Sequence, residues 1–433
     1  MSTDSHILGQ YREKVLRWRG LLITFFLGQG VSQVLQLVSG FAIIHWLSKD
    51  QYATFALLLA IRGTSSVLMD LGFSGGLSAL IGDRCHQPIV VGRYIAAARY
   101  YRNRLLTFGG IILLGVLLFA SYRYEWGIGL GVLFWCVLIV SIFYDAIASF
   151  YTPIFYLQQR IRDLYLVHIS TSCVRLSLLC LAYLTGVLSA PVAIIIGGIQ
   201  SILSAMIYQR KTAADVKLPE DGDLIEPEKK EALQLTLPKV PGAIFYAFQG
   251  QVTIFIVSVV GQYSQIADLG ALSRIGMLFM MPSALISVLI APWFAKLAPN
   301  RLAIGYLVSG LLFSVFAVSL IVANALFPQV FLFILGSEYS ELKTEVFLFS
   351  IFASLNVLSG LVFALNASRK WVYYWTGPTT ILAYMLTLVF FVVSVDLTLI
   401  SNIITMSIIT ATLTLCVNLV VSLVGFRRMR LTK

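Results

Sequence analysis

Long runs of apolar residues alternate with short polar stretches along almost the whole chain. A helix needs about 20 apolar residues to cross the ~30 Å hydrocarbon layer of a membrane. The pattern therefore predicts an all-α polytopic membrane protein with twelve membrane-spanning helices. The predicted spans are residues 20–47, 51–80, 105–122, 127–157, 164–186, 189–208, 241–262, 268–294, 302–327, 344–366, 371–393 and 398–424.

One long polar stretch interrupts this pattern after the sixth predicted span. We interpret residues 209–240 as a cytoplasmic linker between an N-terminal six-helix lobe, 1–208, and a C-terminal six-helix lobe, 241–433. Each lobe holds an even number of spans, so both lobes start on the same side of the membrane. This topology is typical of parallel repeats related by an axis along the membrane normal.

The composition and the distribution of charge agree with this class of protein. Of the 433 residues, 58% are hydrophobic and 12% are charged, whereas soluble domains carry about 25% charged residues. The net charge is +11, but 25 of the 31 Lys and Arg residues lie in the two termini and in alternate loops, with three in the opposite loops. The positive-inside rule then places both termini in the cytoplasm and explains the charge without a nucleic-acid partner.

Three smaller features complete the outline. The apolar run at 20–47 is too long for a signal-peptide core, so we expect a first span and not a cleaved signal. Segment 89–104 mixes apolar and basic residues at helical spacing, which predicts a helix along the inner membrane surface, with an ordinary polar link as the alternative. The five cysteines and four histidines show no metal-ligand or disulfide spacing, so we expect no metal and no cofactor.

Two charged residues, Arg62 and Asp70, lie inside the second predicted span. A charge at bilayer depth costs at least about 2.5 kcal/mol, so it normally faces a protein interior or a watery cavity. Arg62 lies ten residues beyond Tyr52, about 15 Å along a helix and near the middle of the span. We predict that Arg62 lines a cationic cavity; a structural pair with an acid on another helix is the alternative. Asp70 is a candidate for ion coupling or a helix-end residue.

A polar stripe runs along the first predicted span. Gln29, Ser32, Gln33 and Gln36 follow the spacing i, i+3, i+4, i+7 and so share one helix face. Gln36 lies thirteen residues before the following turn and Arg62 thirteen after it, so an antiparallel hairpin brings both to the same depth. The stripe is predicted to line the same cavity, with interhelical hydrogen bonding as the alternative.

Further polar positions lie in later spans. Arg274 in the eighth span is followed by Pro282, which can hinge a helix, and Arg274 either lines the cavity or extends towards the outer face. Gln251 gives the seventh span a thinner polar face. Asp145 and Arg175 flank the turn near residue 160 symmetrically, so a helical hairpin predicts a buried ion pair between them, with proton coupling as the alternative role.

Several sequence segments resemble those of a known transporter family. LSKDQYATFALLLA (47–60), MDLGFSGGLSALIG (69–82), ILGSEY (334–339) and FLFSIFASLNVLSGLVFALNASRK (347–370) are similar to bacterial polysaccharide, or O-antigen, flippases. These flippases belong to the multidrug/oligosaccharidyl-lipid/polysaccharide export superfamily. Ala53 is a departure, because that family usually has glycine there. The resemblance implies a MATE-like fold, in which two lobes form a V around a central cavity and rock between inward-open and outward-open states. It also implies that arginines at the places of Arg62 and Arg274 contact the pyrophosphate of an undecaprenyl-linked glycan.

The resemblance and the buried charges together lead to a functional expectation. We expect a flippase that moves a lipid-linked oligosaccharide across the bacterial inner membrane by alternating access, acting as a monomer and not as an enzyme. Membrane lipids, a glycan polymerase and glycosyltransferases are its expected partners. A MATE-type cation-coupled antiporter is the main alternative and would favour an acidic cavity. A membrane glycosyltransferase would need large outer loops, and a non-transporting scaffold would not need charges in its spans.

Overall fold

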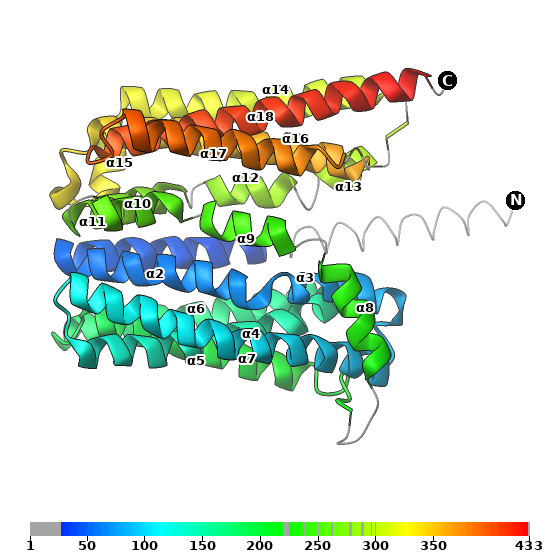
Figure 1. Ribbon diagram of the computed structural model, residues 1–433, viewed down its shortest axis with the longest axis horizontal. Coiled ribbons are helices and arrows are strands. Elements are labelled where there is room, and N and C mark those ends of the chain that lie inside the picture. The colour runs from blue at the N-terminus through cyan, green and yellow to red at the C-terminus, as the bar shows by residue number, and fades with distance from the viewer. Residues whose placement is uncertain are drawn as a thin grey trace, which may run out of the picture. The chain divides into compact units, whose positions relative to one another are not determined.

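A computed structural model describes residues 27–219, 225–237, 240–249, 251–260, 263–276, 279–286, 290–295, 297–298, 300–369, 371 and 373–431. These residues form helices, turns and loops, and no strand occurs among them (Figure 1). The all-α polytopic architecture predicted from the hydrophobic pattern is confirmed.

Ten described helices are long and apolar enough to cross a membrane. They are Leu27–Trp46, α2 (Lys49–Asp70), α4 (Pro88–Arg123), α5 (Ile128–Leu157), α6 (Ile161–Leu184), α7 (Ala190–Lys211), α14 (Leu302–Leu326), α16 (Lys343–Ser368), α17 (Thr376–Ser394) and α18 (Ile400–Leu431). The shorter helices are α3 (Phe73–Ile81), η1 (Gly82–Arg84), α8 (Glu226–Thr236), α9 (Val240–Gln249), α10 (Val252–Val260), α11 (Tyr263–Gly276), α12 (Met280–Leu285), α13 (Ala291–Ala295), α15 (Pro328–Leu335) and η5 (Ser337–Tyr339).

The seventh predicted span, 241–262, corresponds to the bent helix pair α9 and α10, which together would make an eleventh span. Within the eighth predicted span, 268–294, the structure describes α11, α12 and α13, and Pro282 lies inside α12.

The chain divides into two compact units. Unit 1 comprises Met1–Ser39 and Ile61–Gln249, and unit 2 comprises Gly40–Ala60 and Gly250–Lys433. The division passes through α2, so that the first half of this helix belongs to unit 2 and the second half to unit 1.

The two units pack corresponding helices in the same order. In unit 1, α5 packs most extensively on α7 and then on α4, and α6 packs on α7. In unit 2, α16 packs most extensively on α18 and then on α14, and α17 packs on α18. In both cases these are the third to sixth spans of a half, as parallel repeats require.

Helix α4 corrects the interpretation of segment 89–104. The segment was expected to lie along the membrane surface and to be separate from a span beginning at residue 105. Instead, α4 runs without interruption from Pro88 to Arg123, and Val91, Ile95 and Arg102 are buried. The basic residues of this segment therefore do not exclude it from the packed helices, because its apolar positions continue the period of the helix that follows.

Helix α8 and its flanking chain are folded onto unit 1. Helix α8 lies against α3 and α4 (Figure 1), and its Ala232 joins a buried apolar cluster that includes Leu77 and Ile95. The Tyr94 hydroxyl donates to Glu231 Oε2 at 2.5 Å. The described part of the segment between the lobes is therefore a packed element of unit 1.

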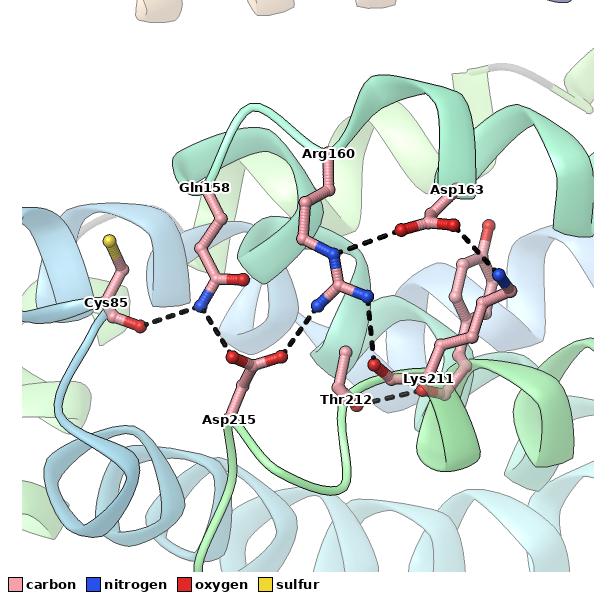
Figure 2. Close-up of polar contacts among 8 residues, drawn as sticks. Cys85, Gln158, Arg160, Asp163, Lys211, Thr212 and Asp215 are labelled. Atoms are coloured by element: carbon pink, nitrogen blue, oxygen red, sulfur yellow. Dashed lines mark hydrogen bonds and ion pairs between the residues drawn. The ribbon is translucent and has the colours of Figure 1, made fainter.

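A cluster of polar side chains joins the chain that follows α7 to the turn between α5 and α6 (Figure 2). Arg160 donates from Nε to Asp163 at 3.1 Å, from Nη1 to Asp215 at 2.7 Å and from Nη2 to the Lys211 carbonyl at 3.1 Å. Gln158 donates to Asp215 at 3.1 Å, and Lys211 Nζ donates to Asp163 at 2.9 Å. Since all three nitrogens of one guanidinium are used, the turn between α5 and α6 is tied to the end of α7.

Candidate functional site

An ion pair between Arg62 on α2 and Asp145 on α5 lies within unit 1. Arg62 Nη2 donates to Asp145 Oδ2 at 2.5 Å and to Ser201 Oγ on α7 at 2.7 Å. The Arg62 side chain is 18% exposed and that of Asp145 is 35% exposed. The pair is therefore partly shielded from solvent but remains accessible to a ligand.

The guanidinium of Arg62 is only partly engaged. Both of its bonds come from Nη2, and in the part of the chain that the structure describes, Nε and Nη1 have no hydrogen-bond partner. A Cβ on Gly197 would lie 3.4 Å from Nη1, so the absence of a side chain there leaves room beside this nitrogen. Arginine presents five N–H donors in a planar fork that matches carboxylate and phosphate oxygens. Three of these donors, one on Nε and two on Nη1, remain for a ligand.

Asp70 takes part in a second ion pair. Its Oδ1 accepts from Arg102 Nη1 at 3.3 Å, and its Oδ2 accepts from the Ser74 hydroxyl at 2.7 Å and from the Gly72 backbone at 3.2 Å. Leu71 and Gly72 have φ angles of 46° and 88°, which turn the chain between α2 and α3. Asp70 is thus placed as a helix-end residue that caps α3.

The two ion pairs form one series of alternating charges. Arg102 is 3% exposed, and the charges of both Asp70 and Asp145 act on it. Arg102 Nη2 also donates to the carbonyl of Ile142, one turn before Asp145 on α5. The order Asp70, Arg102, Asp145, Arg62 therefore contains two acids and two arginines, and its net formal charge is zero.

The prediction of an ion pair between Asp145 and Arg175 was wrong. Asp145 pairs with Arg62, and Arg175 Nη1 donates to Gln200 Oε1 at 3.3 Å. The hairpin argument matched the two residues by distance from the turn but could not fix the rotation of each helix. Arg62 thus pairs with an acid on another helix, which was predicted from the sequence as the alternative to a cavity role.

The glutamine stripe of the first helix falls partly inside unit 1. Gln29 Oε1 accepts from the Tyr165 hydroxyl at 2.9 Å, which is an interhelical bond to α6. Gln33 is 9% exposed, and its Nε2 has no hydrogen-bond partner among the described residues. Gln36 is half-buried, and Gln251 is half-buried in the turn before α10. Among the described residues of unit 1, no hydrogen bond joins Gln29, Gln33 or Gln36 to Arg62.

Arg274 is buried in unit 2. It is 8% exposed, donates from Nε to the Tyr52 hydroxyl at 3.3 Å and lies over the ring of Phe55 at 5.9 Å. A Cβ on Gly40 would lie 3.5 Å from its Cδ. No acid pairs with Arg274 among the described residues, so its charge is buried beside an aromatic face and a hydroxyl.

Sequence reasoning missed two residues of this site, Arg102 and Ser201. Arg102 was counted with the basic cytoplasmic segment, although its helical spacing from Val91 and Ile95 was a usable signal. Ser201 is an ordinary small residue in an apolar helix, and nothing in the sequence distinguishes it. Its role depends on the approach of α7 to α2, which is a tertiary relationship.

The corresponding helices of unit 2 are joined by neutral groups. Asn366 on α16 donates to the Asn418 carbonyl on α18 at 2.9 Å and accepts from Ser422 at 2.8 Å. Asn324 on α14 donates to Ser350 on α16 at 2.6 Å. The described parts of α14, α16 and α18 thus use amides and hydroxyls, whereas α4 and α5 contribute Arg102 and Asp145 to the charge series.

No family model and no curated protein matches the sequence. The structure resembles that of a multidrug resistance MATE family transporter of the MOP superfamily in an inward-facing conformation, with 14% identity, a TM-score of 0.64 and coverage of 93% of this chain and 94% of that one. The chain has the MATE fold.

Other proteins with the MATE fold are similarly related. The eukaryotic MATE transporter AtDTX14 has 13% identity, a TM-score of 0.59 and 95% coverage of both chains. A MOP superfamily transporter from Pyrococcus furiosus, whose reversed pocket polarity has been taken to suggest a different function, has 15% identity, a TM-score of 0.61 and coverage of 95% of this chain and 94% of that one. The MATE fold is also known in an outward-facing conformation. Identities of 13–15% establish the fold, and the substrate must be inferred from the chemistry of the site.

Proposed function

We propose that this protein is a flippase that carries an undecaprenyl-pyrophosphate-linked oligosaccharide from the inner to the outer leaflet of the bacterial cytoplasmic membrane. In this proposal both termini are cytoplasmic, transport proceeds by alternating access, and the product serves surface polysaccharide biosynthesis. The MATE fold and the resemblance to polysaccharide flippases support it. The observation that carries it is the partly engaged guanidinium of Arg62, with three N–H donors left for an anion.

The chemistry of arginine favours an anionic head group. A guanidinium stays charged at any physiological pH and offers parallel N–H groups to phosphate oxygens. The polyprenyl tail can stay in lipid while the head group passes along helices that satisfy their own backbone polar groups. An interior-negative membrane potential favours outward movement of an anion by about 2.3 kcal/mol per charge per 100 mV. Arg274, buried without an acid partner among the described residues, is proposed as a second contact.

For the remaining polar positions we propose the roles that the sequence suggested. Gln29, Gln33, Gln36 and Gln251 are proposed to contact the glycan head group, and Gln33 has a buried amide donor available for it. Asp70, Asp145 and Arg175 are proposed coupling residues. Asp145 is the more exposed of the two acids in the charge series, so it has more room to exchange its partner.

The decisive experiment compares variants of Arg62 in cells whose surface glycan depends on this protein. We expect Arg62→Ala to reduce surface glycan by roughly 10- to 100-fold, because a charge-assisted hydrogen bond contributes about 1.5–3 kcal/mol. Arg62→Lys keeps the charge but loses the planar fork, and should retain intermediate export. Arg104→Ala is the matched control, since Arg104 is exposed on α4. Normal glycan in Arg62→Ala, at a normal protein level in the membrane, would contradict the proposal.

A second candidate function is a MATE-type cation-coupled antiporter of drugs or small molecules. The observation in its favour is Asp145, whose side chain is 35% exposed and whose Oδ1 has no hydrogen-bond partner in the described part of the chain. This function predicts that Asp145→Asn abolishes drug resistance conferred by the protein while Arg62→Ala has the smaller effect. The flippase predicts the opposite order for glycan export.

A further inference from the structure

We propose that Asp145 is a displaceable internal competitor for the anion-binding group of Arg62. In the resting protein its carboxylate is bonded to the guanidinium, and a phosphate or pyrophosphate group must take its place in order to bind in the bidentate manner. This inference rests on the proposed function, since it concerns how the same arginine receives an anionic head group. It assigns to Asp145 the control of which anions bind and how tightly.

The atoms used by Arg62 carry the first step of the argument. A guanidinium offers two pairs of parallel N–H groups, one from Nη1 and Nη2 and one from Nε and Nη2. Nη2 belongs to both pairs, and its two bonds go to Asp145 at 2.5 Å and Ser201 at 2.7 Å. In each pair, the Nη2 donor is therefore already bonded and the other donor is not. A ligand that binds in the bidentate manner must remove one of these two acceptors from Nη2.

Charge decides which acceptor leaves. An incoming phosphate is repelled by the Asp145 carboxylate and not by the neutral Ser201 hydroxyl. Like charges close together in a protein interior cost several kcal/mol. The Asp145 side chain is also the more exposed of the two, at 35% against a buried Ser201, so it has more room to move. Ser201 is also held by its own bond to the Gly197 carbonyl at 3.2 Å.

Arg102 supplies a counter-charge for the displaced carboxylate. The charge of Asp145 already acts on Arg102, whose Nη2 bonds to Ile142 on the same helix as Asp145. Breaking a buried ion pair is costly mainly because one charge is left uncompensated. When Arg62 is taken by the ligand, the displaced carboxylate therefore shares the charge of Arg102 with Asp70.

The test measures the affinity of the purified full-length protein for inorganic pyrophosphate by calorimetric titration. Asp145→Asn removes the competing charge and keeps the shape, so we expect binding to tighten about tenfold, which corresponds to one lost charge–charge competition. Ser201→Ala is the matched control, because it removes the other Nη2 acceptor without removing charge, and its affinity should stay within about twofold of the wild type. Asp145→Glu keeps the charge and should also stay within about twofold.

The outcomes separate this inference from the proposed function. If Asp145→Asn binds as the wild type does while Arg62→Ala loses binding, the competitor role is wrong and Arg62 remains an anion site. Equal tightening in Ser201→Ala, or tenfold tightening in Asp145→Glu, would also overturn the inference; the Glu variant can do so even if Asp145→Asn does not fold. If Arg62→Ala and wild type bind pyrophosphate equally, the anion site at Arg62 fails, and the proposed head-group contact fails with it.

Discussion

The carbonyl oxygen of Lys217 occupies the place that a side chain on residue 92 would need. A Cβ built on Gly92 would lie 1.8 Å from that oxygen, and the Lys217 backbone N–H donates to the Pro88 carbonyl at 3.0 Å. The chain that leaves α7 therefore runs directly over the first turn of α4, and only glycine permits the contact.

Gly92→Ala is expected to destabilise unit 1. Because the clash is with backbone, the neighbour cannot move aside cheaply, and overpacking of this kind costs about 1–3 kcal/mol or more. We expect a lower Tm for the purified protein in detergent. Gly115→Ala on the same helix is the control, since nothing lies within 4 Å of its Cβ position, and its Tm should not fall. Equal Tm values for the two variants would show that residue 217 does not pack on α4.

The pair Asp70–Arg102 makes a second prediction about stability. Arg102→Ala leaves Asp70 with its charge uncompensated at 17% side-chain exposure, and loss of one partner from a buried pair costs about 3–5 kcal/mol. Asp70→Asn should be milder, because the single amide oxygen can still accept from one of the Gly72 and Ser74 backbone N–H groups, which now bond to different carboxylate oxygens. In thermal unfolding, Arg102→Ala should therefore have a lower Tm than Asp70→Asn. The reverse order would mean that the cap of α3, and not the ion pair, dominates.

The same residues show how far sequence reasoning could reach. The apolar pattern was sufficient for the fold class and most helices, because membrane spans require long apolar runs whatever their tertiary contacts. It also marked Arg62 as a candidate site residue, since a charge in such a run is conspicuous. It could not pair Arg62 with Asp145, because pairing depends on the rotation and tilt of α2 and α5. Arg102 was missed because it lies among basic residues just before an expected span, where positive-inside loop residues are also found.

A third prediction concerns the neutral contacts of unit 2. Asn366 is 2% exposed and joins α16 to α18 through both its amide nitrogen and its oxygen. Asn366→Ala removes both of these interhelical hydrogen bonds, which together contribute about 1–3 kcal/mol, although Ser422 Oγ still donates to the Asn418 carbonyl at 3.0 Å. Asn356→Ala is the matched control on α16, because Asn356 is exposed and bonds only within its own helix. We expect the first variant to lower the Tm and the second to leave it unchanged; a similar loss in both would argue against a role for the buried amide.

The last prediction tests the approach of the anion to Arg62. Gly197→Ala would place a methyl group 3.4 Å from Nη1, which is an ordinary contact that the fold can accept but which fills the space beside two of the free donors. If the head group binds across Nη1 and Nη2, the variant loses a charge-assisted hydrogen bond of about 1.5–3 kcal/mol, and export should fall about tenfold or more. Gly129→Ala on α5 is the control, as nothing lies within 4 Å of its Cβ position. Unchanged export in Gly197→Ala, with Arg62→Ala inactive, would instead assign the anion to the edge formed by Nε and Nη2. That edge lies away from Gly197, so the two results identify which side of the guanidinium faces the substrate.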